Sequence, residues 1–356
     1  MNAVMREGKK TLLVSNMYPS EKFPNFGTFV KTSEEQLLSC DITVDKVVID
    51  EVYSNLIHKI LGYLSFYIST FIRCVFGSYD YVYIQFISHS SPPVILARFF
   101  KRFEIISHIH GGDITKLKHT SNVGFLLKRY ISQRIINLSS VVVFPSESYA
   151  KFAESNFTIS NYIVYPSGGV DPKVFKSTAN KLSSYKVGYA GRLVASKNVD
   201  SIVQAIALVD KSVRLEIVGD GKDRNMLEDL VASLGISDRV RFLGKLSQTE
   251  LAKWYSSIDV LVYPSDSESL GLVPLEAMSC GVYCILSDIP AFLELKEKGF
   301  DFDTVSPTNS EEISSMISNF YAVGNINKER LLENSKLVSE IYGSENAKKK
   351  LYKAFC

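Results

Sequence analysis

Short apolar runs alternate with longer segments of helical period along nearly the whole chain. The longer segments, such as 200–209, repeat apolar residues every three or four positions, as an amphipathic helix does. Strands that alternate with helices predict a parallel sheet with helices on both faces, so we expect an α/β protein with two doubly wound parallel sheets. The predicted strands are 11–15, 44–49, 81–85, 104–108 and 141–144 in the first half and 186–189, 214–218, 240–242, 260–263 and 284–287 in the second.

The division between the two sheets is predicted at a turn-rich stretch. Residues 166–172, Pro-Ser-Gly-Gly-Val-Asp-Pro, concentrate turn-forming residues between a strand and a new alternating pattern. A chain of 356 residues is also longer than one hydrophobic core usually serves. We expect one domain over 1–170 and a second over 171–340, with ligands bound beyond the carboxyl ends of the strands.

Composition narrows the class of protein. Hydrophobic residues make up 46% and charged residues 22% of the chain, which is typical of a folded protein. The 40 Lys and Arg against 38 Asp and Glu leave a formal net charge of +2, so nucleic acid is not an expected partner. The five cysteines are scattered without zinc-ligand spacing, and the start of the chain does not resemble a signal peptide. Both features favour a reducing, cytoplasmic setting.

Positive charge in the first half concentrates around one apolar segment. Residues 55–134 hold ten Lys or Arg against three acids. Within them, 56–77 has apolar residues at helical spacing, which first predicts a helix packed in the core. A second interpretation is contact with the anionic inner face of a membrane, because Phe, Tyr and basic residues are in excess there. We do not expect it to cross a bilayer, since its longest uncharged stretch, 60–72, is shorter than about 20 residues.

The loop 263–281 holds the richest set of polar residues after a predicted strand. Gly271 precedes a helix whose free N–H groups and dipole suit a phosphate. Glu276, about one turn into that helix, is placed to accept hydrogen bonds from a vicinal diol such as a ribose, and Glu268 lies in the loop itself. The competing interpretation is that Glu276 only complements the helix dipole and that Glu268 is solvated.

Two further loops of the second half end in glycine turns. In 188–198, Gly191 permits a tight turn, and Arg192 and Lys197 are two cations suited to a diphosphate. The alternative is that both cations simply face water. Gly219, in the turn 218–221, lets backbone approach a nucleotide. No GxxxxGK[ST] or GxGxxG sequence occurs in the chain.

In the first half two loops follow predicted strands. Gly27, in the loop 16–30, lacks a side chain that would keep backbone away from a ligand. His110 stands beside Asp113 in the loop 108–116 and is suited to donate to a sugar hydroxyl or to a developing charge. An ordinary turn histidine is the alternative.

Taken together and in this order, these loops resemble the family 4 retaining glycosyltransferases of the GT-B fold. The matching segments are 268–281 (an E-x7-E signature with an EAMxxG tail), Gly191 and Arg192 with Lys197 (GRL…K), 218–221 (VGDG), 169–175 (a GVDxxxF hinge) and 110–113 (HGxD). The chain departs from the family at Gly27, which is a single glycine where a pair is usual, and at Gly168, which replaces an Asn.

The resemblance implies two Rossmann-like domains facing a central cleft, with 341–356 as a helix crossing back to the first domain. It also implies a reaction without a metal or other cofactor. His110, Glu268, Arg192 and Lys197 are the implied catalytic residues, with His110 and Asp113 on the acceptor side. The implied donor-binding residues are Gly27, Gly191, Arg192, Lys197, Gly219, Leu246, Glu268, Ser269, Gly271, Leu272, Val273 and Glu276.

The function implied by the resemblance is a retaining transfer of a sugar from a nucleotide-sugar donor, a UDP-sugar rather than a GDP-sugar. The acceptor would be a glycan or a lipid-linked molecule in the synthesis of a bacterial surface polysaccharide such as capsule or O-antigen. The expected setting is cytoplasmic, with peripheral contact at the anionic inner membrane surface. Two alternatives remain open: a non-catalytic scaffold that binds sugar nucleotides or glycans, and a sugar-nucleotide epimerase of the same fold.

Overall fold

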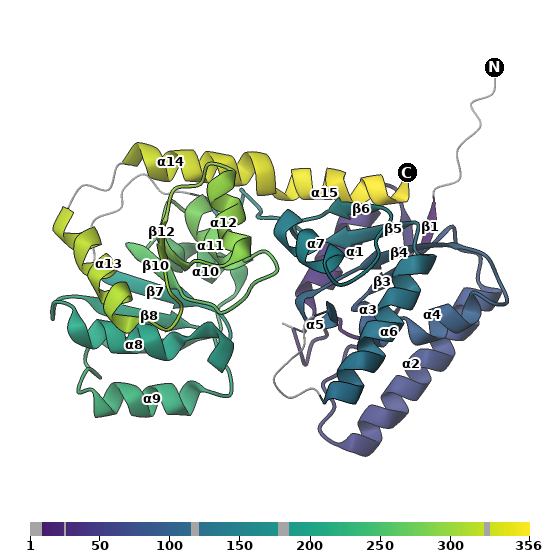
Figure 1. Ribbon diagram of the computed structural model, residues 1–356, viewed down its shortest axis with the longest axis horizontal. Helices are drawn as coiled ribbons and strands as arrows, with labels where there is room; N and C mark the ends of the chain where they lie inside the picture. The colour runs from purple at the N-terminus through teal and green to yellow at the C-terminus, as the bar shows by residue number, and fades with distance from the viewer. Residues whose placement is uncertain (1–8, 25, 115–120, 177–184, 324–327) are drawn as a thin grey trace. The chain divides into compact units, whose positions relative to one another are not determined.

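The computed structural model describes residues 9–24, 26–114, 121–176, 185–323 and 328–356 (Figure 1). The chain divides into two compact units. The first contains residues up to Gly168 together with Ala347–Cys356, and the second contains Gly169–Asn346. At the first division Ser167, Gly168 and Gly169 have φ angles of 48°, 95° and 72°. Glycine adopts this left-handed region without strain, which accounts for Gly168 and Gly169 at the turn-rich stretch.

The first unit is built on a six-stranded parallel sheet in the order β2-β1-β3-β4-β5-β6. Leu12 and Val14 of β1 pack into one core and Leu13 into another, because successive side chains of a strand point to opposite faces. The strands are β1 (Lys10–Ser15), β2 (Thr43–Val48), β3 (Tyr81–Gln85), β4 (Glu104–His108), β5 (Val141–Phe144) and β6 (Tyr162–Val164).

Helices cover both faces of this sheet. One core contains Leu37 of α1 together with Leu351 and Phe355 near the C-terminus, and the other contains Phe66 and Cys74 of α2. The helices are α1 (Thr28–Leu38), α2 (Leu56–Phe76), α3 (Ile87–Ser90), α4 (Pro92–Ala97), α5 (Gly111–Ile114), α6 (Asn122–Leu138), α7 (Glu147–Glu154), α15 (Ser344–Tyr352) and the 3-10 turn η3 (Lys353–Phe355).

The second unit has its own six-stranded parallel sheet in the order β12-β11-β10-β7-β8-β9. Its strands are β7 (Lys186–Ala190), β8 (Arg214–Val218), β9 (Val240–Gly244), β10 (Val260–Tyr263), β11 (Tyr283–Ser287) and β12 (Asp303–Val305). Its helices are η1 (Ala195–Lys197), α8 (Val199–Leu208), α9 (Arg224–Ser233), α10 (Gln248–Tyr255), α11 (Leu272–Ser279), α12 (Pro290–Glu297), α13 (Ser310–Val323), α14 (Lys328–Leu337) and η2 (Val338–Tyr342).

The predicted fold class, two doubly wound parallel sheets, is confirmed. All ten predicted strands are present, and β6 and β12 are two further strands that the sequence pattern did not reveal. In each sheet the first strand along the chain has neighbours on both sides, β2 and β3 around β1 and β10 and β8 around β7. Connections leave such a strand in opposite directions, which opens a space for ligands beyond its carboxyl end.

The prediction that 56–77 packs in the core is confirmed for one side of the helix only. Helix α2 buries Phe66, Thr70 and Cys74, but its opposite side is exposed. By length and composition α2 is the one helix, among the residues that the structure describes, that could cross a membrane, although only a minor part of it is buried.

Candidate active site

Four loops lie next to one another at the carboxyl edge of the second unit's sheet. Strands β10, β7, β8 and β9 are neighbours in that order, so the loops that follow them are neighbours too. They hold Ser269 and Gly271, Arg192 and Lys197, Gly219, and Leu246 respectively. The predicted donor-binding residues of the second half therefore lie along one edge of one sheet, in these loops or in helix α11.

The glycines of these loops allow backbone to touch backbone. The N–H of Gly191 donates to Val218 O at 2.9 Å, and the N–H of Gly219 donates to Gly244 O at 2.7 Å. A Cβ on Gly219 would stand 1.8 Å from the carbonyl oxygen of Gly191. Gly219 is thus required by the neighbouring loop itself, whatever ligand binds there.

Lys197 and Glu268 are brought together as a buried ion pair. Lys197 ends the 3-10 turn η1, with its side chain 10% exposed, and its ammonium contacts the carboxylate of Glu268, which is 16% exposed. The Lys197 Nζ also donates to Ser265 Oγ at 3.1 Å, and the Tyr263 hydroxyl donates to Glu268 Oε1 at 2.7 Å. A buried pair with these additional hydrogen bonds fixes both charged groups at the sheet edge.

Arg192 differs from Lys197 in its surroundings. It is exposed, and within the described residues its guanidinium has no hydrogen-bond or ion-pair partner. Its carbonyl accepts from the Tyr189 hydroxyl at 3.1 Å, which holds the backbone of the loop. Arg192 thus presents an unpaired cation at the same loop that holds Lys197.

Helix α11 begins directly after Gly271. Gly271 has a φ of 87°, and a Cβ there would lie 2.5 Å from a ring carbon of Phe292. No other residue fits this position without displacing Phe292. The half-buried Leu272 and Val273 form the first turn, where backbone N–H groups have no partner inside the helix. The geometry suits an anionic group at this end of α11.

Glu276 lies one turn further along α11 and is not part of the Lys197–Glu268 pair. The Tyr255 hydroxyl donates to Glu276 Oε2 at 3.2 Å. Burial raises the pKa of Glu276 to about 8, and the hydrogen bond from Tyr255 only partly offsets this effect. The carboxyl group is therefore largely protonated at pH 7 when no ligand is bound.

In the first unit His110 is buried at the carboxyl end of β4. Its ring lies against Phe29, Phe86 and His108, with centroid distances of 4.7, 4.5 and 4.2 Å. Burial lowers the pKa of His110 to about 3, so the imidazole is neutral at physiological pH. The side chain is held rigidly by these rings.

Gln85 is a site residue that the sequence did not reveal, and it decides which nitrogen of His110 bears hydrogen. The Ser33 hydroxyl lies 2.8 Å from Val30 O, to which it donates, so it accepts from Gln85 Nε2 at 2.6 Å. Gln85 Oε1 then faces His110 Nε2 at 3.1 Å and accepts its hydrogen. This leaves Nδ1 as an acceptor, whereas we expected the ring to donate to a sugar hydroxyl or to a developing charge.

Asp113 faces inward. Its carboxylate accepts from the backbone N–H and the hydroxyl of Ser88, at 3.0 and 2.8 Å, and from the backbone N–H of His110 at 2.9 Å. These bonds tie the turn that contains His110 to α3. In this structure Asp113 positions His110, and its predicted place on the acceptor side stays a prediction.

Gly27 immediately precedes helix α1 and has a φ of 78°. A Cβ there would lie 2.9 Å from the backbone carbon of Met17. Glycine is therefore required here because the backbone of Met17 lies close to Gly27 within the loop that follows β1. Its predicted contact with the donor is not addressed by this packing.

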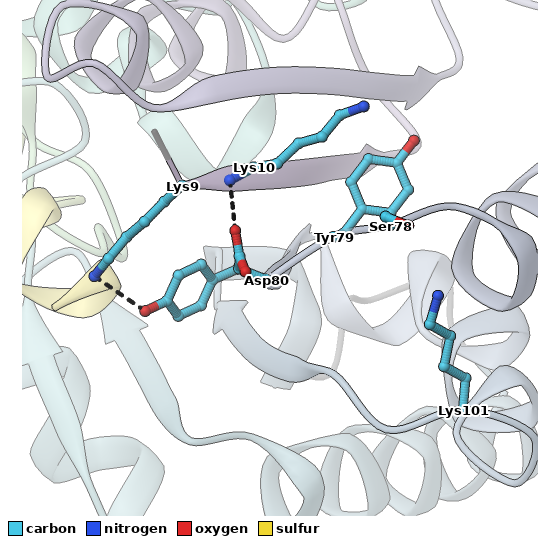
Figure 2. Close-up of a pocket in the computed structure, with 7 residues that line it drawn as sticks. Lys9, Lys10, Ser78, Tyr79, Asp80 and Lys101 are labelled. Atoms are coloured by element: carbon cyan, nitrogen blue, oxygen red, sulfur yellow. Dashed lines mark hydrogen bonds between the residues drawn. The ribbon is translucent and has the colours of Figure 1, made fainter. Parts of the chain in front are cut away.

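A cavity of about 830 Å³ lies elsewhere, beside Lys10 and Tyr81 at the amino ends of β1 and β3 (Figure 2). Its lysines have internal partners: Lys9 Nζ bonds to Tyr81 Oη at 3.3 Å, Lys10 Nζ lies 3.2 Å from Asp45, and Lys101 donates to Gly77 O. Because ligands of such sheets bind beyond the carboxyl ends, this cavity is not the candidate active site.

No group of three or more His, Cys, Asp or Glu that could hold a metal ion occurs within the described ranges. The residues gathered at the carboxyl edge of the second sheet are instead two cations, two carboxyl groups and a helix N-terminus. This set suits a phosphorylated ligand that carries hydroxyl groups.

The sequence is similar to known glycosyltransferases. The family model of the glycosyl transferases group 1 matches residues 170–352. N-acetyl-alpha-D-glucosaminyl L-malate synthase of Bacillus anthracis is 31% identical over 216 residues, 56% of this chain and 54% of that protein. The O-antigen chain mannosyltransferase RfbU of Salmonella typhimurium is 36% identical over 124 residues, 35% of each chain. The chain thus matches about half or less of the length of these relatives.

Solved structures match nearly the whole chain. The sucrose-phosphate synthase of Thermosynechococcus elongatus has a TM-score of 0.79 at 17% identity and covers 98% of both chains. Anabaena HepE in complex with UDP-glucose has a TM-score of 0.73 at 18% identity and covers 98% of this chain and 99% of its own. The chain belongs to the glycosyl transferases group 1 family and has the GT-B fold.

Proposed function

We propose that this protein is a retaining glycosyltransferase that moves a sugar from a nucleotide-sugar donor to a hydroxyl of a glycan or lipid-linked acceptor. The observation that carries the proposal is the row of four adjacent loops at the carboxyl edge of the second sheet, with the buried Lys197–Glu268 pair and Glu276 on α11. Group 1 membership and the names of the relatives support the same reaction class.

Each part of a nucleotide-sugar has a counterpart in these loops. Arg192, Lys197 and the first turn of α11 bind the diphosphate, and Glu276 binds the ribose hydroxyls. Glu268 and Ser269 face the transferred sugar. Gly219 and the segment 244–246, including Leu246, contact the base largely through backbone. The complexes of HepE with UDP and UDP-glucose favour a UDP-sugar over a GDP-sugar as the first donor to try.

The reaction breaks the bond between the sugar C1 and the phosphate oxygen while the acceptor oxygen bonds to C1 on the same face. The acceptor proton passes to a phosphate oxygen of the leaving nucleoside diphosphate. Lys197 and Arg192 stabilise the negative charge that develops on that leaving group, so no metal is required. Neutral His110 contacts the transferred sugar through Nδ1, which accepts from a hydroxyl.

The decisive experiment measures turnover of purified protein over UDP-, GDP- and dTDP-sugars with candidate acceptors. Lys197→Ala and Glu276→Ala are expected to lower kcat/KM by about 100-fold or more, since each removes a buried polar contact to the donor. Lys253→Ala and Glu297→Ala, at exposed positions of α10 and α12, are matched controls and should leave turnover unchanged. Wild-type rates for the two site variants would refute the site.

The same assay tests the finer parts of the proposal. Activity that survives EDTA supports the metal-independent reaction, and loss that Mg²⁺ or Mn²⁺ restores overturns it. An α-linked product from an α-linked donor, read by NMR, supports retention. A protein that binds donor without turnover would be a scaffold, and one that alters the donor sugar or frees nucleotide without consuming an acceptor would be an epimerase.

The cellular role that we propose is cytoplasmic synthesis of a bacterial surface polysaccharide, supported by the similarity to RfbU. Deletion of the gene should remove a sugar from the surface glycan of its host, and the Lys197→Ala variant should fail to restore it. A deletion strain with unchanged capsule and lipopolysaccharide would contradict this role.

A further inference from the structure

Helix α2 leaves one complete row of apolar side chains without packing. Six residues spaced four apart form a ridge along its outer side and are each between 48% and 78% exposed. Helical residues four apart are neighbours on the helix surface, so these side chains form one continuous ridge inclined to the helix axis. Contiguous apolar surface of this kind marks a site of interaction with another molecule or a membrane. The ridge residues are Leu56, Ile60, Leu64, Ile68, Ile72 and Phe76.

The exposed apolar surface of the ridge continues onto the neighbouring helices. α2 packs against α4, and α4 packs against α6, within one layer on the same face of the first sheet (Figure 1). The Phe71 and Phe100 rings, 5.6 Å apart, join α2 to the turn after α4. Leu96, Phe99 and Phe100 in this part, and Val123, Leu126, Leu127 and Tyr130 on α6, are each more than half exposed. We call these residues and the α2 ridge the apolar face.

The three segments that form the apolar face carry cations and no acids; among these cations, Arg73 lies 3.7 Å from Asp45 of β2 and Lys101 donates to Gly77 O. α2, residues 92–103 and α6 contain no Asp or Glu. Burial lowers the pKa of His89 to about 4, and the positive charges of Lys128 on α6 and Lys59 on α2 add to this effect, so both lysines lie near α3. Lys116 and Lys118 fall outside the described residues. The cations of the three segments are Lys59, Arg73, Arg98, Lys101, Arg102, Lys128, Arg129 and Arg134.

This combination selects an anionic bilayer as the occupant. Apolar side chains flanked by Lys and Arg enter the headgroup region, and each cation near an anionic surface strengthens the attraction. A second copy of this face would place cations against cations. If α2 spanned the bilayer, Phe66, Thr70 and Cys74 would have to leave the core of the first unit. The helix therefore lies along the surface.

The position of the apolar face also bears on the acceptor. α2 follows the carboxyl end of β2, and α6 follows the turn that contains His110 at the carboxyl end of β4. Both helices thus begin at the sheet edge where His110 and Asp113 lie. A lipid tail held in the bilayer beside this edge would keep its polar head near His110.

We propose that the apolar face rests on an anionic membrane surface and that the acceptor of the transferase is lipid-linked and is taken from that membrane. The second half of this statement rests on the proposed function, and the first half does not.

The first experiment is flotation of the full chain with phosphatidylcholine vesicles with and without phosphatidylglycerol. We expect binding only with phosphatidylglycerol, weakened by salt because screening reduces the attraction. The triple variant Ile60→Glu, Leu64→Glu, Ile68→Glu should bind at least about tenfold more weakly. Leu208→Glu and Leu332→Glu, at exposed apolar positions of the second unit, are the matched controls. Since all three changes lie at exposed positions, the variant should unfold at the same urea concentration as the wild type.

Three results would overturn the proposed contact of the apolar face with a membrane. The first is no binding to anionic vesicles at low salt. The second is wild-type binding by the triple variant. The third is a wild-type protein that is a dimer and binds no vesicles, together with a triple variant that is a monomer. This result would identify a second copy of the chain as the occupant of the apolar face. Resistance of the bound protein to alkaline extraction would show that α2 spans the bilayer and would also contradict the proposal.

The acceptor is tested separately with vesicles made from a bacterial membrane lipid extract and labelled nucleotide-sugar. We expect label in organic-soluble product, reduced at least about tenfold by the triple variant, while donor hydrolysis in solution is unchanged. Label only in water-soluble glycan would overturn the lipid-linked acceptor. Absence of any donor turnover by the wild type would instead count against the proposed function and leave the vesicle result standing.

Discussion

The hydrogen-bonded series Ser33, Gln85 and His110 shows how one buried amide sets the chemistry of a neighbouring ring. Gln85 comes from the last position of β3 and reaches both α1 and the turn after β4. Because Ser33 uses its hydrogen on its own helix, the amide has one orientation, and His110 has one tautomer. Gln85 is therefore a positioning residue for His110.

The first prediction tests this role. Gln85→Met keeps the length of the side chain but frees the ring, and should lower kcat by about tenfold to 100-fold with little change in donor affinity. Gln85→Glu still accepts from Nε2, but its charge should raise the pKa of His110 and move the acid limb of the pH–rate profile to higher pH. Gln204→Met, exposed on α8, is the control. Identical pH profiles for Gln85→Glu and wild type would contradict the assignment.

The second prediction follows from the pKa of Glu276. Ribose hydroxyls bind better to the carboxylate than to the acid, and the unliganded group has a pKa of about 8. Donor binding at pH 7 should therefore release a proton, and affinity should rise as pH increases from 6.5 towards 8.5. Calorimetry in buffers of different ionisation enthalpy measures the proton directly. Proton release that persists in Glu276→Gln would place its source elsewhere.

For single residues, the sequence identified the candidate site residues but not the residues that they contact. The spacing of Glu268, Gly271 and Glu276 placed them on a loop and a helix start, as observed. The pairing of Lys197 with Glu268 joins residues 71 positions apart, and the His110–Gln85 contact joins residues 25 apart. Such contacts depend on strand order, which local patterns do not contain. The neighbours of the glycines were hidden for the same reason.

Among the elements, buried parallel strands were predicted well because they are continuous runs of β-branched residues bounded by polar turns. The strands β6 and β12 escaped notice because each has only three residues, too few for a pattern. Each pairs with only one neighbour, at the edge of its sheet. Edge strands owe their place to the strand beside them more than to their own sequence.

Helix α2 was predicted from the sequence, but the surroundings of its apolar side chains were not. Apolar residues surround it on nearly every side, which indicates burial without saying whether protein or lipid provides it. Only the packing separates the inner residues, such as Phe66, from the outer ones, such as Ile68. The sequence established the helix, and the structure showed which of its sides packs in the core and which is exposed.

The third prediction uses this contrast. Phe66→Ala should lower the free energy of unfolding by about 3–5 kcal/mol because it leaves a cavity against the sheet. Ile68→Ala, two positions away on the outer row, should change it by less than about 0.5 kcal/mol. Urea denaturation of both variants in the absence of lipid measures the difference. A large loss for Ile68→Ala would mean that the outer row is covered by protein.

For the whole molecule, the two units should respond to pH in opposite directions. In the first unit burial lowers the pKa of His89 to about 4, of His110 to about 3, and of His108 well below its usual value. Between those values and about 6.5 the unfolded chain binds protons that the folded unit does not, so stability falls with falling pH. In the second unit the raised pKa of Glu276 has the reverse effect between 4.5 and about 8.

The fourth prediction is that acidification from pH 7.5 to 5.5 destabilises the first unit and not the second. Each buried histidine contributes up to about 1.4 kcal/mol per pH unit below its unfolded pKa. The single tryptophan, Trp254, is buried in the second unit, so its fluorescence reports that unit alone while circular dichroism reports both. Coincident transitions at every pH would show that the units unfold together and would contradict this independence.

The first unit is discontinuous along the chain, with Phe355 buried beside Leu13 and Tyr83 and its carbonyl accepting from Tyr81. During translation the first unit cannot complete its fold until Ala347–Cys356 has been synthesised, and this segment is made after the whole second unit. Until then its sheet has an uncovered apolar patch, exposed to chaperones and to aggregation. The order of synthesis and the order of completion are thus reversed, and a stalled or shortened message would yield a complete second unit joined to an incomplete first unit.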